Sequence, residues 1–163
     1  MDNSQFGRSN QNLMDILEKY PITGASGAGL AIGSDTAKVK TATAIYYFIG
    51  GKLYTLAATD DLITLSGTVH NSGTVLDMIN VFVFSVDYAG TVTATMGTEA
   101  LALADVVFPV TPVGEVVIGF LIIDLGTGAG SNDFVGGTTA LDDGTVVPSA
   151  VYIDSVAPMR FGS

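Results

Sequence analysis

The stretch DMINVFVFSVDYAGTVTATM, residues 77–96, decides the fold class. Its first half, residues 77–87, is apolar at nearly every position, which is typical of a strand that is central in a sheet or lies against a neighbouring subunit. Its second half alternates, with Val92, Ala94 and Met96 on one face and threonines on the other, which predicts a half-exposed strand. Short strands joined by tight turns of this kind favour an antiparallel β-sandwich or barrel.

The residues on both sides of this stretch repeat the pattern. In TAIYYFIGGKLYTLAA (residues 43–58), Gly50 and Gly51 suit a two-residue hairpin turn, whose central residues need positive φ. Further strands are predicted at 62–69, with a glycine at its bend, at 115–124 and at 145–154, and a helical turn at 99–105. Pro148 places the last strand at a sheet edge or at a bulge. Residues 41–163 are therefore predicted to form one β-rich domain.

The first 40 residues are predicted to form a separate N-terminal arm. A short amphipathic helix, ended by Pro21, is indicated by apolar residues at helical spacing: Leu13, Ile16, Leu17 and Tyr20. Residues 22–40 follow with the glycine, alanine and serine content of a flexible linker. A short helix on a linker cannot bury its apolar stripe alone, so we expect it to dock on its own domain or on a partner.

The charge distribution restricts the partners of the chain. The 163 residues carry a net charge of −10, and residues 53–159 contain twelve acidic residues and no lysine or arginine. A surface without cations cannot neutralise phosphates, which excludes this body from nucleic-acid binding. The longest apolar run, residues 116–123, is far shorter than the roughly 20 residues of a membrane-spanning helix. We therefore expect neither nucleic acid nor membrane as a partner.

Composition favours a homo-oligomer. Apolar residues make up 48% of the chain and charged residues 13%, about half the share in an ordinary soluble domain. A chain of this composition is expected to bury its apolar excess in contacts between subunits. The absence of cysteine excludes disulfides and thiolate metal sites.

Two glycine-rich stretches resemble the start of a nucleotide-binding loop. In GFLIIDLGTGAGSNDFVGG (residues 119–137), an apolar strand runs into a glycine loop, as in a phosphate-binding loop. Such a loop needs a lysine followed by Ser or Thr, or a helix whose first amides face the phosphate, and neither follows here. Residues 24–33 lack a preceding strand and fail for a similar reason. Both are interpreted as flexible connections, so no cofactor is predicted.

Catalytic and metal-binding patterns are weak. His70 is the only histidine and no G-x-S-x-G motif is present, so a small hydrolase using His70 stays a remote alternative. The aspartate pairs at 60–61 and 142–143 are adjacent residues, which point to opposite faces of a strand and make no acid/base pair. Asp133 and the LDDG turn at residues 141–144 supply oxygen ligands in loops. A calcium ion bound there is an alternative to the interpretation of these aspartates as solvated turn residues. The chain is predicted not to be an enzyme, with no catalytic and no metal residues.

Five fragments, in order, carry a resemblance to a known family: YYFIGGKLYTLAATDD, FSVDYAGTVTATMGTEA, FPVTPVGEVVIGFLII, DFVGGTTALDD and VYID. Together they span most of residues 44–154. They resemble a recurrent module of tailed-bacteriophage virion proteins, of the head decoration, cement or head-fibre type. The resemblance implies a β-rich homo-oligomer, often a homotrimer, bound to the major capsid protein on the exterior of an icosahedral shell. It implies no catalytic residue.

The leading hypothesis is therefore a structural virion protein that decorates or cements the capsid exterior. The N-terminal arm, with the four apolar helix residues as contacts, is then the expected shell-docking element. The alternative is a tail or fibre component that contacts the host, for which exposed aromatic side chains would be needed.

Overall fold

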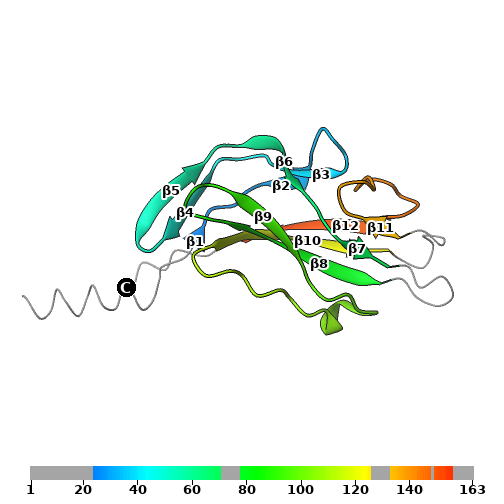
Figure 1. The fold of residues 1–163 in the computed structure, drawn as a ribbon. Helices are drawn as coiled ribbons and strands as arrows, with labels where there is room; N and C mark the ends of the chain where they lie inside the picture. Colours follow the sequence, from blue (N-terminus) through cyan, green and yellow to red (C-terminus); the bar gives the residue numbers. More distant parts are fainter. Residues whose placement is uncertain (1–23, 71–77, 126–132, 148, 156–163) are drawn as a thin grey trace, which may run out of the picture.

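The computed structural model describes residues 24–70, 78–125, 133–147 and 149–155 (Figure 1). Within these ranges the chain is mainly β, and every strand pair is antiparallel. The strands are β1 (Gly24–Ala25), β2 (Leu30–Ile32), β3 (Lys38–Thr41), β4 (Ile45–Ile49), β5 (Lys52–Leu56), β6 (Thr59–Thr64), β7 (Thr68–Val69), β8 (Ile79–Val86), β9 (Val92–Met96), β10 (Val116–Asp124), β11 (Phe134–Val135) and β12 (Ser149–Asp154). The predicted mainly β, antiparallel fold is confirmed.

The strands form two layers around one core. One layer is the four-stranded sheet β12-β10-β8-β9, and the other contains the sheets β1-β4-β5 and β2-β3-β6 (Figure 1). Large side chains from both layers are fully buried between them, among them Phe82, Phe84, Tyr47 and Ile45. Phe134, from the short pair β11-β7, packs edge-on against Phe82 with ring centroids 6.1 Å apart. The arrangement is a β-sandwich.

Strand β8 is central in its sheet, as residues 77–87 predicted. It pairs with β10 on one side and with β9 on the other. Phe82 and Phe84 point into the sandwich core, whereas Val81 and Val83 belong to a second apolar cluster on the outer face of the sheet. Both faces of β8 are therefore buried within one copy of the chain, and no neighbouring subunit is needed to cover it.

Two local predictions are confirmed and one is corrected. Gly50 and Gly51 form the β4–β5 turn with φ of 58° and 75°, which glycine adopts without steric cost. β12 lies at an edge of its sheet, as Pro148 indicated. The predicted single strand 62–69 is instead two strands, β6 and β7, in different sheets. The chain changes sheet near Gly67, whose φ is 105°.

The linker prediction is wrong for residues 24–40. These residues form β1, β2 and most of β3, and Ala28 and Val39 are fully buried. Small residues there allow close packing: a Cβ at Gly33 would lie 2.2 Å from Asp61 Oδ1, and Gly29 has a φ of 59°. The β-sandwich therefore includes residues 24–40. The predicted helix before them lies outside the described residues.

The carboxylate of Asp154 connects the last strand, β12, to the start of β2. Asp154 is the last residue of β12, and its carboxylate accepts the backbone N–H groups of Gly29 and Leu30, at 2.9 and 3.0 Å. These contacts connect residues about 125 positions apart in sequence. They hold the start of β2 against the last strand.

Tyr152 gives a prediction for stability at high pH. Its side chain packs against the core, and its hydroxyl is buried with no hydrogen-bond partner among the described residues. Burial, with a further contribution from Asp142, raises the pKa of Tyr152 from 10.0 to about 12. The folded state keeps this proton to higher pH than the unfolded state, so stability falls as pH rises from about 10 to about 12.

We expect Tyr152→Phe to remove that part of the pH dependence. Because the hydroxyl is unpaired, its loss should leave stability at pH 7 unchanged or raise it by up to about 1 kcal/mol. Urea unfolding at pH 7, 10 and 11.5 measures both effects. A variant that is clearly less stable at pH 7 would show that the hydroxyl has a partner.

Candidate interaction surface

The connection from β9 to β10, residues 97–115, covers the outer face of the four-stranded sheet. We call it the covering segment. It runs below β8 and β9 in Figure 1 and includes the 3₁₀ turn Leu103–Asp105, which agrees with the helical turn predicted at 99–105. Val106 packs in the cluster of Val81 and Val83, and the Phe108 ring lies edge-on to that of Phe120, with centroids 5.8 Å apart. The segment is thus fixed to the sheet by its own apolar contacts.

Backbone hydrogen bonds hold the covering segment against itself and against the start of β8. Thr98 N–H donates to Val107 O at 2.9 Å, and Ala100 N–H donates to Ile79 O at 3.0 Å. Gly97 allows this approach, because a Cβ there would lie 2.6 Å from Val107 O. Proline at 109 and 112 removes two backbone donors from the segment, which disfavours a further ladder strand.

The solvent side of the covering segment is apolar. Its exposed large side chains are Leu101, Leu103, Val107, Phe108, Val110 and Val113. Val110 is 90% exposed, and Val113 is fully exposed. β12 continues this apolar area, because its exposed Val151 and Ile153 pair with Ile122 and Phe120 of β10.

We call these eight side chains the outer apolar surface. Single exposed apolar residues are ordinary, but eight on the covering segment and the adjacent edge strand indicate an interaction site.

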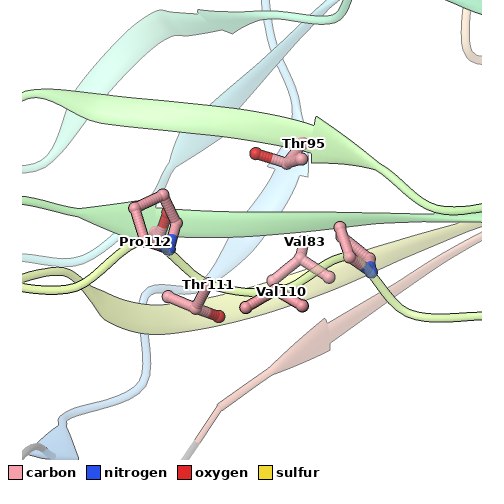
Figure 2. A pocket seen from close by; sticks show the side chains of 7 residues that line it. Val83, Thr95, Val110, Thr111 and Pro112 are labelled. Atoms are coloured by element: carbon pink, nitrogen blue, oxygen red, sulfur yellow. The ribbon is translucent and has the colours of Figure 1, made fainter.

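A shallow pocket lies where the covering segment meets the sheet (Figure 2). It is lined by Val83, Ser85 and Thr95 from the sheet and by residues 109–112 from the covering segment. None of these side chains is titratable. The buried Ser85 hydroxyl bonds to the carboxylate of Glu115 and to Thr93. The lining of the pocket thus consists of aliphatic groups and hydroxyl groups, and the carboxylate next to it belongs to Glu115.

A second exposed apolar area lies on the opposite layer, on the β4–β5 hairpin. Tyr46 and Leu53 are each 52% exposed, and the half-buried Phe48 lies opposite Leu53 in the pair. Lys52, at the turn, places its ammonium 5.2 Å from the centre of the Tyr54 ring. Lys52 pairs with Ile49 and therefore belongs to the other face of the hairpin, together with Tyr54. We call Tyr46, Phe48 and Leu53 the hairpin surface, which combines aromatic and aliphatic groups.

Charge is divided between these two parts of the sandwich. Among the described residues up to Thr64 there are three lysines and three aspartates. Among the described residues after Thr64 there are nine acidic residues and no lysine or arginine. The outer apolar surface thus belongs to the acidic part, and the hairpin surface belongs to the part that holds every cation of the described chain.

His70 lies just after β7 and is exposed. Its ring Nδ1 is 2.8 Å from Glu99 Oε1, and its backbone N–H donates to Glu99 Oε2 at 2.9 Å. Within the described ranges no serine or threonine hydroxyl bonds to the ring. The contact fastens the end of β7 to the covering segment.

The Asp60–Asp61 pair does not follow the expected strand geometry. Both carboxylates reach the same turn, where Asp60 accepts Ser34 N–H at 3.1 Å and Asp61 accepts Asp35 N–H at 2.8 Å. Asp61 has a φ of 50°, which redirects its side chain away from ordinary strand alternation. The hydrogen bonds from Ser34 lower the pKa of Asp60. The pair caps a turn, and no acid/base role follows from it.

The other predicted positions hold no metal-binding geometry in the described part of the chain. Asp143 Oδ1 accepts Thr145 N–H at 2.9 Å, and Asp133 and Asp142 are exposed. No three His, Asp or Glu side chains gather as metal ligands in the ranges that the structure describes. The glycine loop 126–132 lies outside them. So do the predicted contact residues Leu13, Ile16, Leu17 and Tyr20.

The described residues also contain no helix with the length and apolarity needed to cross a bilayer. Comparison of the chain with models of protein families, with curated proteins and with solved structures gave no match. The outer apolar surface and the hairpin surface are therefore the features from which a function can be argued. The sequence carried a signal for the first of them, the run LALADVVFPVTPVG, which is apolar without a strand period and contains two prolines.

Proposed function

We propose that this chain is a structural virion protein of a tailed bacteriophage, which decorates or cements the exterior of the capsid as a homo-oligomer. The observation that carries the proposal is the outer apolar surface, because clustered exposed apolar side chains are typical of protein–protein contacts. The β-sandwich and the ordered motifs of residues 44–154 support the same class of protein. The partners are the major capsid protein and further copies of the chain, and a homotrimer is the expected oligomer.

The charge of the body is compatible with a place on the outside of the shell. The described residues after Thr64 include nine acidic residues and no lysine or arginine, so this part of the body has no means to bind the phosphates of packaged DNA. The proposed shell contact is the N-terminal arm, now limited to residues 1–23, with Leu13, Ile16, Leu17 and Tyr20 as its apolar contacts.

Co-sedimentation with purified capsids that lack the chain tests this assignment. We expect the full chain to bind, and a variant with serine at positions 13, 16, 17 and 20 to lose at least about 90% of its occupancy, which corresponds to about 1.4 kcal/mol or more of binding free energy. The matched control carries serine at the exposed positions Leu101 and Val135, apolar residues away from the arm. Unchanged occupancy of the arm variant would remove the arm as the docking element, and a full chain that does not bind capsids would contradict the proposed function.

The two alternatives make different demands. A tail component that contacts the host needs exposed aromatic side chains that lie close together. Tyr46 and Tyr88 are exposed, whereas Tyr47 is buried. A hydrolase would depend on His70 for its activity, whereas the proposed structural function does not use this residue. We therefore expect His70→Ala to leave capsid binding unchanged.

A further inference from the structure

We propose that the apolar side of the N-terminal arm docks on the hairpin surface of its own chain. We call the four apolar arm residues at helical spacing the arm stripe: Leu13, Ile16, Leu17 and Tyr20. The occupant of the hairpin surface is thus a named segment of the same chain. This docking goes beyond the proposed function, because it takes place without a capsid.

The hairpin surface is an apolar face on the outside of its layer. Tyr47 of β4 is buried in the core, so its neighbours Tyr46 and Phe48 point to the other side of the sheet. Leu53 pairs with Phe48 and shares that side. The outward face of an antiparallel sheet is ordinarily polar, so aromatic and aliphatic groups on this one indicate a contact.

The arm enters the sandwich beside this face. β1 is the first described strand, and its Gly24 pairs with Phe48. Directly opposite residues share a face, and glycine has no side chain, so β1 leaves that flank of Phe48 uncovered. Residues 21–23 are all that separates Tyr20, the last residue of the stripe, from Gly24. So short a connection holds the stripe near the hairpin surface at a high effective concentration.

The lengths of the connection and of the stripe match the size of the face. The four steps from Gly24 to Tyr20 span at most about 14 Å. β5 is two strands away from β1, and strands are about 5 Å apart, so its distance is about 10 Å. In a helix, Leu13 and Tyr20 are about 10 Å apart along the axis, within the roughly 14 Å length of β4. The stripe can therefore cover both strands of the hairpin.

The direction of β1 requires the arm to turn back over the hairpin. β1 is antiparallel to β4, so the chain reaches Gly24 from the end of the hairpin that holds Gly50 and Gly51. Pro21 ends the predicted helix, and Gly24 follows three residues later. Proline and glycine are the residues that tight turns favour. The sequence thus provides a turn between the stripe and the first strand.

The outer apolar surface is the other face on which the stripe could dock. It lies outside the four-stranded sheet, whereas β1 belongs to the other layer (Figure 1). The arm would have to pass round the edge of the sandwich to reach it. The hairpin, in contrast, is paired directly with β1. Chain connectivity therefore favours the hairpin surface.

The docking has a consequence for capsid binding, and this consequence rests on the proposed function. The arm stripe is also the proposed shell contact, so the hairpin surface and the shell compete for the same four side chains. The arm must leave the hairpin before it binds the shell. Docking on the hairpin thus regulates access to the arm.

Hydrogen exchange of residues 13–20, measured by mass spectrometry on the full chain without capsids, tests the proposal. A helix of this length is marginal in water by itself, so protection of these amides reports docking. We expect protection in the wild type, and exchange at least about tenfold faster in Leu53→Asp, which places a charge against the stripe. Tyr46→Ser, which removes a ring without adding a charge, should act in the same direction. Val135→Asp, at an exposed strand valine outside both surfaces, is the matched control and should keep the protection.

Protein concentration and one further variant separate this contact from the alternatives. Docking within one chain is independent of protein concentration, whereas protection that grows with concentration would assign the stripe to a second copy and overturn the proposal. Val110→Asp alters the outer apolar surface and should leave the exchange unchanged. Circular dichroism and the unfolding midpoint establish that the variants are folded.

Three further results would overturn the proposal: no protection of residues 13–20 in the wild type, unchanged exchange in both hairpin variants, or faster exchange in Val110→Asp alone. Because no capsid is present, each of these results leaves the proposed function to the co-sedimentation experiment.

Discussion

Phe82→Ala is expected to lower the free energy of unfolding by about 3–5 kcal/mol, the range for removing a fully buried phenylalanine ring. Phe82 is on the central strand β8, has no exposed surface and contacts the Phe134 ring edge-on. Its loss would leave a cavity between the two layers of the sandwich and remove the contact that holds β11 to the core. Urea unfolding at pH 7, followed by circular dichroism, measures the change.

Tyr88→Ala is the matched control for this prediction. Tyr88 is also an aromatic residue of the β8–β9 hairpin, but it is 69% exposed, so its removal should change stability by no more than about 0.5 kcal/mol. Equal losses for Phe82→Ala and Tyr88→Ala would contradict the position of the core between the two layers.

Asp154→Ala is expected to destabilise the chain by about 2–3 kcal/mol, because hydrogen bonds to a charged acceptor contribute about 1.5–3 kcal/mol and the freed N–H groups are partly buried. The variant loses both acceptors of the Gly29 and Leu30 amides. Hydrogen exchange of these two amides should accelerate more than exchange in β8. The loss is therefore local to the joint between β2 and β12 before the whole sandwich unfolds.

The isosteric Asp154→Asn variant separates hydrogen bonding from packing. An amide keeps one carbonyl oxygen and replaces the other acceptor with a donor, which would face a backbone N–H. We expect it to lose at least about 1 kcal/mol. Asp142→Ala, at an exposed turn, is the control and should stay within about 0.5 kcal/mol of the wild type. An asparagine variant as stable as the wild type would contradict the role given to the carboxylate.

Much of the fold could be predicted from local patterns. The alternation in residues 91–96 and the Gly50-Gly51 turn depend on neighbours in sequence, so the β8–β9 and β4–β5 hairpins could be predicted. The place of residues 24–40 could not, because Leu30 packs beside Gly119 and its amide bonds to Asp154. Contacts over such separations leave no period in the sequence, and small residues that pack closely have the same composition as a linker.

The candidate surface was only partly predictable. The low charge and high apolar content of the chain predicted an apolar excess, and the sequence placed it on the central strands. In the structure the outer face of β8 is covered by Val106 and its neighbours in the covering segment, and the exposed apolar side chains are on that segment instead. Both β8 and the covering segment are apolar, and the path of the chain decides which of them is outermost. Residue type alone does not specify that path.

Electron cryo-microscopy of intact particles that contain this chain tests the central claim most directly. The proposed function predicts density for the β-sandwich on the capsid exterior, at three-fold or quasi-three-fold positions, and no such density on particles assembled without the chain. Density for the chain only at the tail, with a bare capsid surface, would contradict it.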